Sequence, residues 1–272
     1  MADRDSLAIL IVTFNSIEEI DACLESIVGH TDPFPTTITL IDNASADGTA
    51  DHVRARWPAV QVIDSGGNLG FAKANNIGIR ATRSDYVLLM NPDTVAPPGA
   101  IPTLVRGLAS HPDAAIAGAR LLGPTGFPEL SWGAAITPWN ETKQMLFSRL
   151  YLRKIRRIVR KMDRLSRQAR EVEWVSGACM VIRRADLDAV GGLDERYFMY
   201  NEDVDLCVEM KKRGRLTLYI AGAEVLHHRG KSAPKNPELE RRRQLSHVAY
   251  YEKHLPIWAP LLRVYLKVTG KL

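Results

Sequence analysis

The chain has 272 residues, of which 46% are hydrophobic and 25% are charged, a composition typical of a globular protein with one large domain. It contains no apolar run of the ~18 residues that a membrane-spanning helix needs. The start of the chain, with Asp3 and Asp5, is unlike a secretory signal peptide, and the three cysteines show no CxxC spacing. We therefore expect a cytoplasmic protein without a disulfide framework or a zinc site.

The net charge of +5 is unevenly distributed along the chain. The segment 143–170 contains eleven Lys or Arg residues and one acid, Asp163, so it carries +10 and the remainder of the chain carries −5. This concentration predicts one basic surface and argues against a protein that binds nucleic acid over its whole surface.

Apolar runs alternate with segments of helical periodicity through the first 110 residues. We predict strands at 7–12, 38–41, 60–63 and 86–90, and helices at 17–28, 50–56, 71–80 and 101–110. This alternation is typical of an α/β fold, with a mostly parallel central sheet covered by helices on both faces.

The pattern is less regular after residue 110. We predict strands at 174–182 and 216–220, and helices at 183–190, 204–212 and 238–254. The segment 145–169 is also expected to be helical, because apolar residues recur at helical spacing among its basic residues. The segment 256–272 is apolar and basic.

Polar residues follow each of the first four predicted strands. They are Thr13 and Asn15, Asp42 and Asn43, Asn68 and Gly70, and Asn91 and Asp93. Ligands of such sheets bind beyond the carboxyl ends of the strands, so these residues predict a binding site at one sheet edge. The glycines at 66, 67 and 70 do not form the GxGxxG pattern and follow the third strand, which argues against a dinucleotide-binding dehydrogenase.

Two acidic motifs, Asn91-Pro92-Asp93 and Glu202-Asp203, follow apolar or aromatic runs about 110 residues apart. Carboxylates near a buried element are costly unless they are paired, hydrogen-bonded or bound to a metal. The two motifs together predict a divalent metal and a general base acting on a phosphate-bearing substrate. The simpler alternative for Glu202-Asp203 is a pair of acids that favours a helix N-terminus. His227 follows a further strand-like run and is a candidate metal ligand.

The combination of these motifs resembles glycosyltransferase family 2, most closely its bacterial rhamnosyltransferase-like branch. The resemblance covers residues 6 to 255 and rests on these motifs in order: Ile11-Val12-Thr13-Phe14-Asn15, Ile41-Asp42-Asn43-Ala44-Ser45, Asn68-Leu69-Gly70-Phe71-Ala72, Asn91-Pro92-Asp93, Val175-Ser176-Gly177-Ala178, Gly191-Gly192-Leu193-Asp194-Glu195, Tyr200-Asn201-Glu202-Asp203-Val204-Asp205 and His227-His228-Arg229-Gly230-Lys231-Ser232.

The resemblance implies a GT-A fold and an inverting transfer from a nucleoside diphosphate sugar to a hydroxyl of a glycan or polyprenyl-diphosphate-linked acceptor, in cell-envelope polysaccharide synthesis. It implies one domain at 1–232, with a nucleotide-binding part at 1–120 and an acceptor-binding part at 121–232, which includes the basic amphipathic segment 143–170. A helical extension at 233–272 follows.

The resemblance also implies roles for individual residues. Thr13 and Asp42 match positions that bind the base, and Asn91 falls near the ribose or phosphate. Asp93 matches a ligand of Mg²⁺ or Mn²⁺, with His227 as a further ligand, while Asp203 matches the general base and Glu202 orients it or contacts the acceptor. The predicted nucleotide site is completed by Asn15, Asn43, Asn68, Gly70 and Lys73. The usual DxD motif has lost its first acid here, because Asn91 occupies that position.

The basic segment predicts contact with an anionic membrane surface, where polyprenyl-linked acceptors lie. Its exposed cations would include Arg153, Lys154, Arg156 and Arg157, and its apolar residues would form the opposite stripe. The alternative is a solvated helix that packs on the domain. We therefore expect a peripheral protein on the inner face of the cell membrane.

Two other functions are compatible with parts of the pattern. A sugar-phosphate nucleotidyltransferase would need a glycine-rich, basic loop after the first strand, and the residues after Thr13 do not supply one. A non-catalytic module that binds sugar or nucleic acid would leave both acidic motifs without a role, and aromatic residues for base stacking are few.

Overall fold

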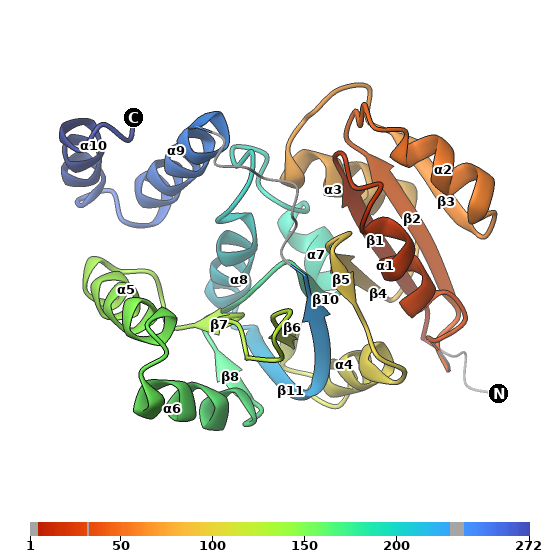
Figure 1. Ribbon diagram of the computed structural model, residues 1–272, viewed down its shortest axis with the longest axis horizontal. Helices are drawn as coiled ribbons and strands as arrows, with labels where there is room; N and C mark the ends of the chain where they lie inside the picture. The colour runs from red at the N-terminus through yellow and green to blue at the C-terminus, as the bar shows by residue number, and fades with distance from the viewer. Residues whose placement is uncertain (1–4, 32, 229–236) are drawn as a thin grey trace.

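The computed structural model describes residues 5–31, 33–228 and 237–272, and it confirms the α/β fold (Figure 1). The strands are β1 Leu7–Thr13, β2 Thr36–Asp42, β3 Val60–Asp64, β4 Tyr86–Met90, β5 Thr94–Val95, β6 Ala114–Leu122, β7 Trp132–Gly133, β8 Arg170–Val172, β9 Trp174–Val175, β10 Cys179–Arg183 and β11 Leu216–His227. The helices are α1 Ile20–Ile27, α2 Thr49–Arg56, α3 Phe71–Ala81, α4 Ala100–Ala109, α5 Pro138–Leu152, α6 Arg156–Ser166, α7 Arg184–Val190, α8 Glu202–Lys212, α9 Pro237–His254 and α10 Ala259–Val268. The motif residues 229–232 and the predicted domain boundary at 232 lie outside the described residues.

Nine strands form one sheet in the order β3-β2-β1-β4-β10-β6-β11-β5, and β8 pairs with β11 at its side. The first four strands are parallel, as predicted. The second half is mixed, because β10 runs antiparallel between β4 and β6. Thr13 is paired in register with Asp42, so the carboxyl ends of β1 and β2 open onto the same edge.

The sheet is buried on both faces, which explains its apolar strands. Every residue of β1 and β4 is buried. Helices α1, α2 and α4 pack on one face, and α3, α7 and α8 pack on the other. The three cysteines are buried without a disulfide, as expected, and burial raises the pKa of each thiol to about 12.

Two predicted elements were wrong in detail, and one strand was missed. The single strand expected at 174–182 is broken into β9 and β10 by residues 176–178, where a backbone N–H turns away from the sheet toward α8. The single helix expected at 145–169 is two helices, α5 and α6, joined at Lys154, which has φ +54°. The central strand β6 was missed because its sequence, AAIAGARLL, is rich in small residues of low strand propensity.

Helix α6 packs its apolar side on the domain, as in the alternative considered for the basic segment. Met162 is buried, and Val159 and Leu165 are half-buried. The buried guanidinium of Arg120 lies 3.3 Å from the Asp163 carboxylate on α6 and also pairs with Glu224 on β11. Arg153, Lys154, Arg156 and Arg157 are all exposed.

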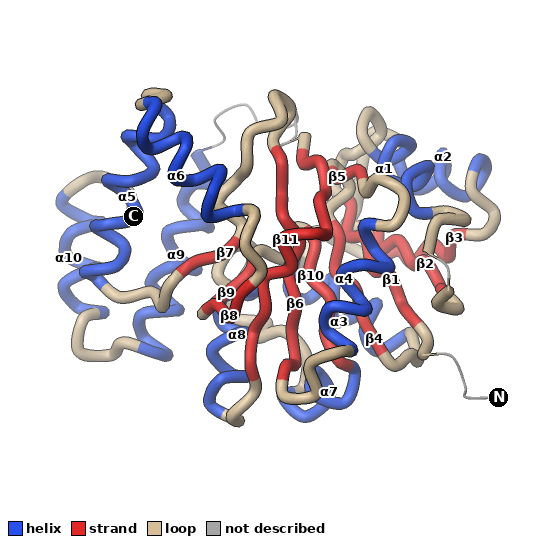
Figure 2. The backbone as a smooth tube through the Cα atoms, turned by 90° about the horizontal axis from the view of Figure 1, so that it is seen from below, coloured by secondary structure: helices blue, strands red, loops and turns tan. Residues whose placement is uncertain are grey.

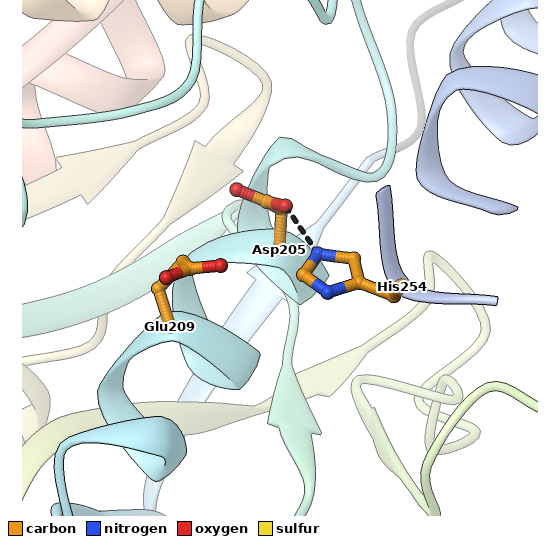
Figure 3. A group of neighbouring side chains, drawn as sticks. All are labelled: Asp205, Glu209 and His254. Carbon is orange, nitrogen blue, oxygen red and sulfur yellow. Dashed lines mark hydrogen bonds and ion pairs between the residues drawn. The ribbon is translucent and has the colours of Figure 1, made fainter. Parts of the chain in front are cut away.

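Helix α9 is attached to α8 by a cluster of charged side chains around Asp205 (Figure 3). The buried Asp205 carboxylate accepts hydrogen bonds from Tyr197 (3.0 Å), His254 (2.6 Å) and Lys253 (2.9 Å). The Lys253 ammonium also contacts Asp194 at 2.9 Å. Burial alone would lower the pKa of Lys253, but its hydrogen bonds to these carboxylates raise it. The cluster therefore fixes α9 against the first turn of α8.

We expect Lys253→Met to lower the free energy of unfolding by about 3 kcal/mol, because it leaves the Asp205 carboxylate buried with less compensation. Urea unfolding followed by circular dichroism measures the change. The matched control is Lys211→Met, because Lys211 pairs with Glu173 at the surface, outside the cluster, and should contribute less than about 1 kcal/mol. Equal losses in the two variants would contradict the proposed importance of the buried cluster.

Candidate active site

The ends of β1 and β2 are joined by hydrogen bonds around Asp42. The hydroxyl of Thr13 donates to Asp42 Oδ1 at 3.2 Å, and both side chains are buried. The second oxygen, Oδ2, accepts from the backbone N–H of Ser45 at 3.0 Å. Asn15, with φ +53°, accepts from the N–H of Ala46 at 2.8 Å. These contacts hold the loops after β1 and β2 in one arrangement, and loops at this edge are where α/β sheets bind ligands.

Asn43 orders the glycine-containing loop after β3. Its Oδ1 accepts from the N–H of Leu69 at 2.9 Å, and its Nδ2 donates to Asn68 Oδ1 at 3.1 Å. Gly70, at φ +84°, brings the chain so close to the Phe198 carbonyl that a Cβ there would collide with it. Gly66 in the same loop also has a positive φ, which glycine adopts without steric cost. Lys73 lies exposed on the first turn of α3.

Asp93 and His227 meet where β4 and β11 end. His227 Nε2 lies 3.4 Å from Asp93 Oδ1, and the N–H of His228 donates to the Asp93 carbonyl at 2.8 Å. On the other side of the ring, His227 Nδ1 lies 2.9 Å from Glu129 Oε2. Burial alone would lower the pKa of His227, but the hydrogen bonds to Asp93 and Glu129 outweigh it and raise the pKa to about 9.

Glu129 was missed from the sequence, where it is a single acid in an irregular segment with no motif around it. Its position is set by the N–H of Glu129, which donates to the Leu121 carbonyl at the end of β6. A carboxylate on the second ring nitrogen of a histidine is the arrangement that orients metal-binding histidines. Asp93, His227 and Glu129 therefore fit a divalent cation, with an oxygen and a nitrogen as ligands and Glu129 behind them.

The second group of potential metal-ligating side chains, Asp205, Glu209 and His254, has its ligand atoms within 4.8 Å of one another. The Lys253 ammonium already lies 2.8 Å from Asp205 Oδ1 and 3.5 Å from Glu209 Oε1. Because a cationic side chain compensates these carboxylates, we interpret this group as the anchor of α9 and the Asp93 group as the better metal site.

Asp203 lies at the start of α8, and two backbone N–H groups hold its carboxylate. Gly177 donates to Oδ2 at 2.9 Å, and Val204 donates to Oδ1 at 2.8 Å. The preceding residues, Tyr200 and Asn201, both have φ +70°, which is costly for an L-residue and sharply turns the chain into the helix. The predicted helix at 204–212 is confirmed, with a start two residues earlier.

Burial raises the pKa of Asp203, and the two N–H groups reduce that rise. Its neighbour Glu202 is buried, and its Oε2 has no hydrogen-bond partner within the described part of the chain. Burial and the adjacent Asp203 charge raise the pKa of Glu202 well above its usual range. A carboxylate with a raised pKa is a stronger proton acceptor, so Asp203 is suited to act as a general base.

The dipeptide Gly177-Ala178 joins the two acidic motifs. The Gly177 N–H donates to Asp203, while the Ala178 carbonyl accepts from the N–H of Asn91 at 2.9 Å. Asn76 of α3 adds a further link, because its amide donates to and accepts from the backbone of Leu193 at 2.8 and 2.9 Å. The structure therefore brings the predicted site residues of both halves to one edge of the sheet.

The sequence matches the family described as glycosyltransferase like family 2 over residues 4–246. It is 31% identical over 95% of its length to an N-acetylglucosaminyl-diphospho-decaprenol L-rhamnosyltransferase of Mycobacterium tuberculosis, of which it covers 88%. It is 26% identical over 76% of its length to a low-salt glycan biosynthesis hexosyltransferase of Haloferax volcanii, of which it covers 62%.

Solved structures agree on the fold. The mannosyltransferase PcManGT of Pyrobaculum calidifontis, in complex with GDP-Man and Mn²⁺, matches with a TM-score of 0.65 at 16% identity, over 96% of this chain and 69% of that one. TarS of Staphylococcus aureus matches with a TM-score of 0.55 at 13% identity, over 91% and 72% of the two chains.

The fold and the family together define a sugar-transferring enzyme with the GT-A fold. The chain belongs to glycosyltransferase family 2. The resemblance found in the sequence is thereby confirmed, and the transferase is favoured over the nucleotidyltransferase and the sugar-binding module.

We expect Asp93→Ala to weaken nucleoside diphosphate binding and to remove its dependence on Mg²⁺ or Mn²⁺, because the variant loses the carboxylate that faces His227. Titration calorimetry with and without EDTA measures both effects. Asp64→Ala is the matched control, since Asp64 also ends a strand but pairs with Arg54 at the surface. If Asp93→Ala binds with the same metal dependence as the wild type, another set of ligands holds the cation.

Proposed function

We propose that the protein is an inverting transferase that moves a sugar from a nucleoside diphosphate sugar to a hydroxyl of a polyprenyl-diphosphate-linked glycan. Rhamnose is the favoured sugar, because a relative with 31% identity over 95% of this chain is named as a rhamnosyltransferase that acts on a decaprenol-linked acceptor. The single observation that carries the proposal is the position of Asp203. Its carboxylate is held by Gly177, and the next residue, Ala178, holds the loop of Asn91.

The donor half binds and orients the nucleotide in this proposal. Thr13 and Asp42 recognise the base, and Asn15 and Asn43 hold the loops around it. Asn68, Gly70 and Lys73 complete the nucleotide site, and Asn91 contacts the ribose or phosphate. A divalent cation held by Asp93 and His227 would neutralise the negative charge that develops on the departing diphosphate.

The acceptor half supplies the proton acceptor. Asp203 takes the proton from the acceptor hydroxyl as that oxygen attacks the anomeric carbon from the face opposite the diphosphate. The new carbon–oxygen bond forms while the bond to the diphosphate breaks, so the configuration is inverted. Glu202 is buried beside Asp203, where burial and the Asp203 charge raise its pKa, and it orients Asp203 or contacts the acceptor.

The same proposal divides the chain by task. We assign residues 1–120 to the donor, residues 121–232 to the acceptor, and residues 233–272 to a helical extension. The charged cluster around Asp205 supports this division, because it attaches α9 of the extension to the helix that begins with the general base.

We also propose that the segment 143–170 faces an anionic membrane surface. The support is that Arg153, Lys154, Arg156 and Arg157 are all exposed, while the apolar side of α6 is turned toward the domain. The segment would therefore contact the membrane through its cations, and not through the apolar stripe that the sequence suggested. Among the described residues, no helix combines the length and hydropathy required to cross a bilayer.

We expect Asp203→Asn to reduce sugar transfer by ~100- to 10,000-fold while donor binding stays close to that of the wild type, because the amide cannot accept the proton. Turnover and calorimetric donor affinity are measured on the same preparation. Asp188→Asn, which changes an exposed acid on α7, is the control. Turnover above half of the wild-type value in Asp203→Asn would remove Asp203 from this role.

We expect replacement of Arg153, Lys154, Arg156 and Arg157 by Glu to remove most binding to anionic vesicles at low salt. Each cation near such a surface contributes about 1 kcal/mol. Activity on a lipid-linked acceptor should fall, and activity on a short soluble analogue should be retained. Equal losses on both acceptors would show that the segment serves the folded core or the active site instead.

A further inference from the structure

Helix α10 carries an apolar stripe that the protein leaves exposed. The stripe runs through the turn before the helix and along one helix face, and its side chains are between 55% and 85% exposed. It consists of Ile257, Leu261, Val264, Tyr265 and Val268. Leu261, Val264, Tyr265 and Val268 recur at helical spacing on one side of α10, and Ile257 precedes them in the turn. Exposed apolar surface of this continuity marks a site of interaction.

The opposite face of α10 fixes the helix on the protein. Ala259 and Leu266 are buried there, and Leu262 packs against the same cluster as residues of α9. Arg263 pairs with Glu252 of α9 at 2.5 Å. The packing of α10 on α9 therefore leaves the stripe exposed to solvent and outside the hydrophobic core.

The charges around the stripe indicate the kind of surface that it meets. Residues 255–272 contain Arg263, Lys267 and Lys271 and no acidic residue. Trp258 is half-exposed at the start of the helix, and Tyr265 lies within the stripe. Aromatic residues of this kind, beside apolar residues and cations, are characteristic of helices that lie at a membrane–water interface.

The place of α10 in the fold agrees with the same surface. Figures 1 and 2 show α10 beside α9, at the end of the molecule opposite β1–β3. Helix α6, which follows directly after the exposed cations Arg153 and Lys154, lies toward the same end. The apolar stripe and the basic segment can therefore face one extended partner that has an anionic surface and an apolar interior.

We propose that α10 is an in-plane membrane helix whose apolar stripe inserts below the headgroups of an anionic bilayer. The inference deepens the proposed function, on which it rests for the presence of a lipid-linked acceptor. The basic segment supplies attraction that salt screens, and α10 supplies a contact that salt does not screen. Together they hold the edge of the sheet that bears Asp203 at a fixed height above the bilayer.

The test is co-sedimentation of the full chain with vesicles of phosphatidylcholine and phosphatidylglycerol, at about 0.1 M and about 1 M salt. The wild type should lose part of its binding at high salt and keep the rest. The variant Leu261→Asp with Val268→Asp should lower the high-salt partition coefficient at least about tenfold, because two charges replace inserted apolar side chains. Leu245→Asp changes an exposed leucine of α9 outside the stripe and is the matched control.

Two results would overturn the inference. One is unchanged high-salt binding in the double variant. The other is a wild type that light scattering finds to be a dimer, dissociated by the double variant, with no high-salt binding to vesicles, since the stripe would then join two copies of the chain. Transfer to a short soluble acceptor is measured in parallel. If the wild type keeps its high-salt binding but transfers no sugar, the proposed function fails and the membrane inference stands.

Discussion

The structure depends on the burial of negative charge at the first turn of α8. Three of the four residues at 202–205 are acids, Glu202, Asp203 and Asp205, and the fourth is a valine. Glu202 and Asp205 are buried, and burial raises the pKa of Asp203. Desolvation of this kind is unfavourable unless donors compensate it. The structure compensates each acid in a different way. Asp203 accepts hydrogen bonds from two backbone N–H groups, and Asp205 is contacted by Lys253 and His254. The pKa of Glu202 is raised.

These compensations explain features that otherwise look irregular. The strand predicted at 174–182 is interrupted between β9 and β10, where Gly177 directs its N–H toward Asp203. Helix α9 is attached to α8 because Lys253 and His254 both contact the buried Asp205 carboxylate. The strained backbone at Tyr200 and Asn201 is the turn that brings the acids to the helix start. The burial of these neighbouring carboxylates thus accounts for the break between β9 and β10, the turn at Tyr200 and Asn201, and the attachment of α9.

Much of the donor half could be predicted from the sequence, because its strands are continuous apolar runs and its polar residues sit at strand ends. The prediction was weaker where distant residues decide the structure. The strand β6 has little propensity of its own and forms between β10 and β11. Glu129 has no local motif, and its proximity to His227 results from the pairing of β5 and β6 with β11. The apolar residues of 145–169 have helical spacing, but spacing alone does not distinguish a face against the domain from a face against lipid.

The dipeptide Gly177-Ala178 has a consequence for how such an enzyme can diversify. Because it contacts both the Asn91 loop and Asp203, the span from that loop to the proposed general base is set by a few covalent bonds and not by the docking of separate bodies. Substitutions in the peripheral helices can then change which molecules reach the reaction centre while this span stays constant. Mutations can therefore change which acceptor is used without changing the reaction that the site carries out.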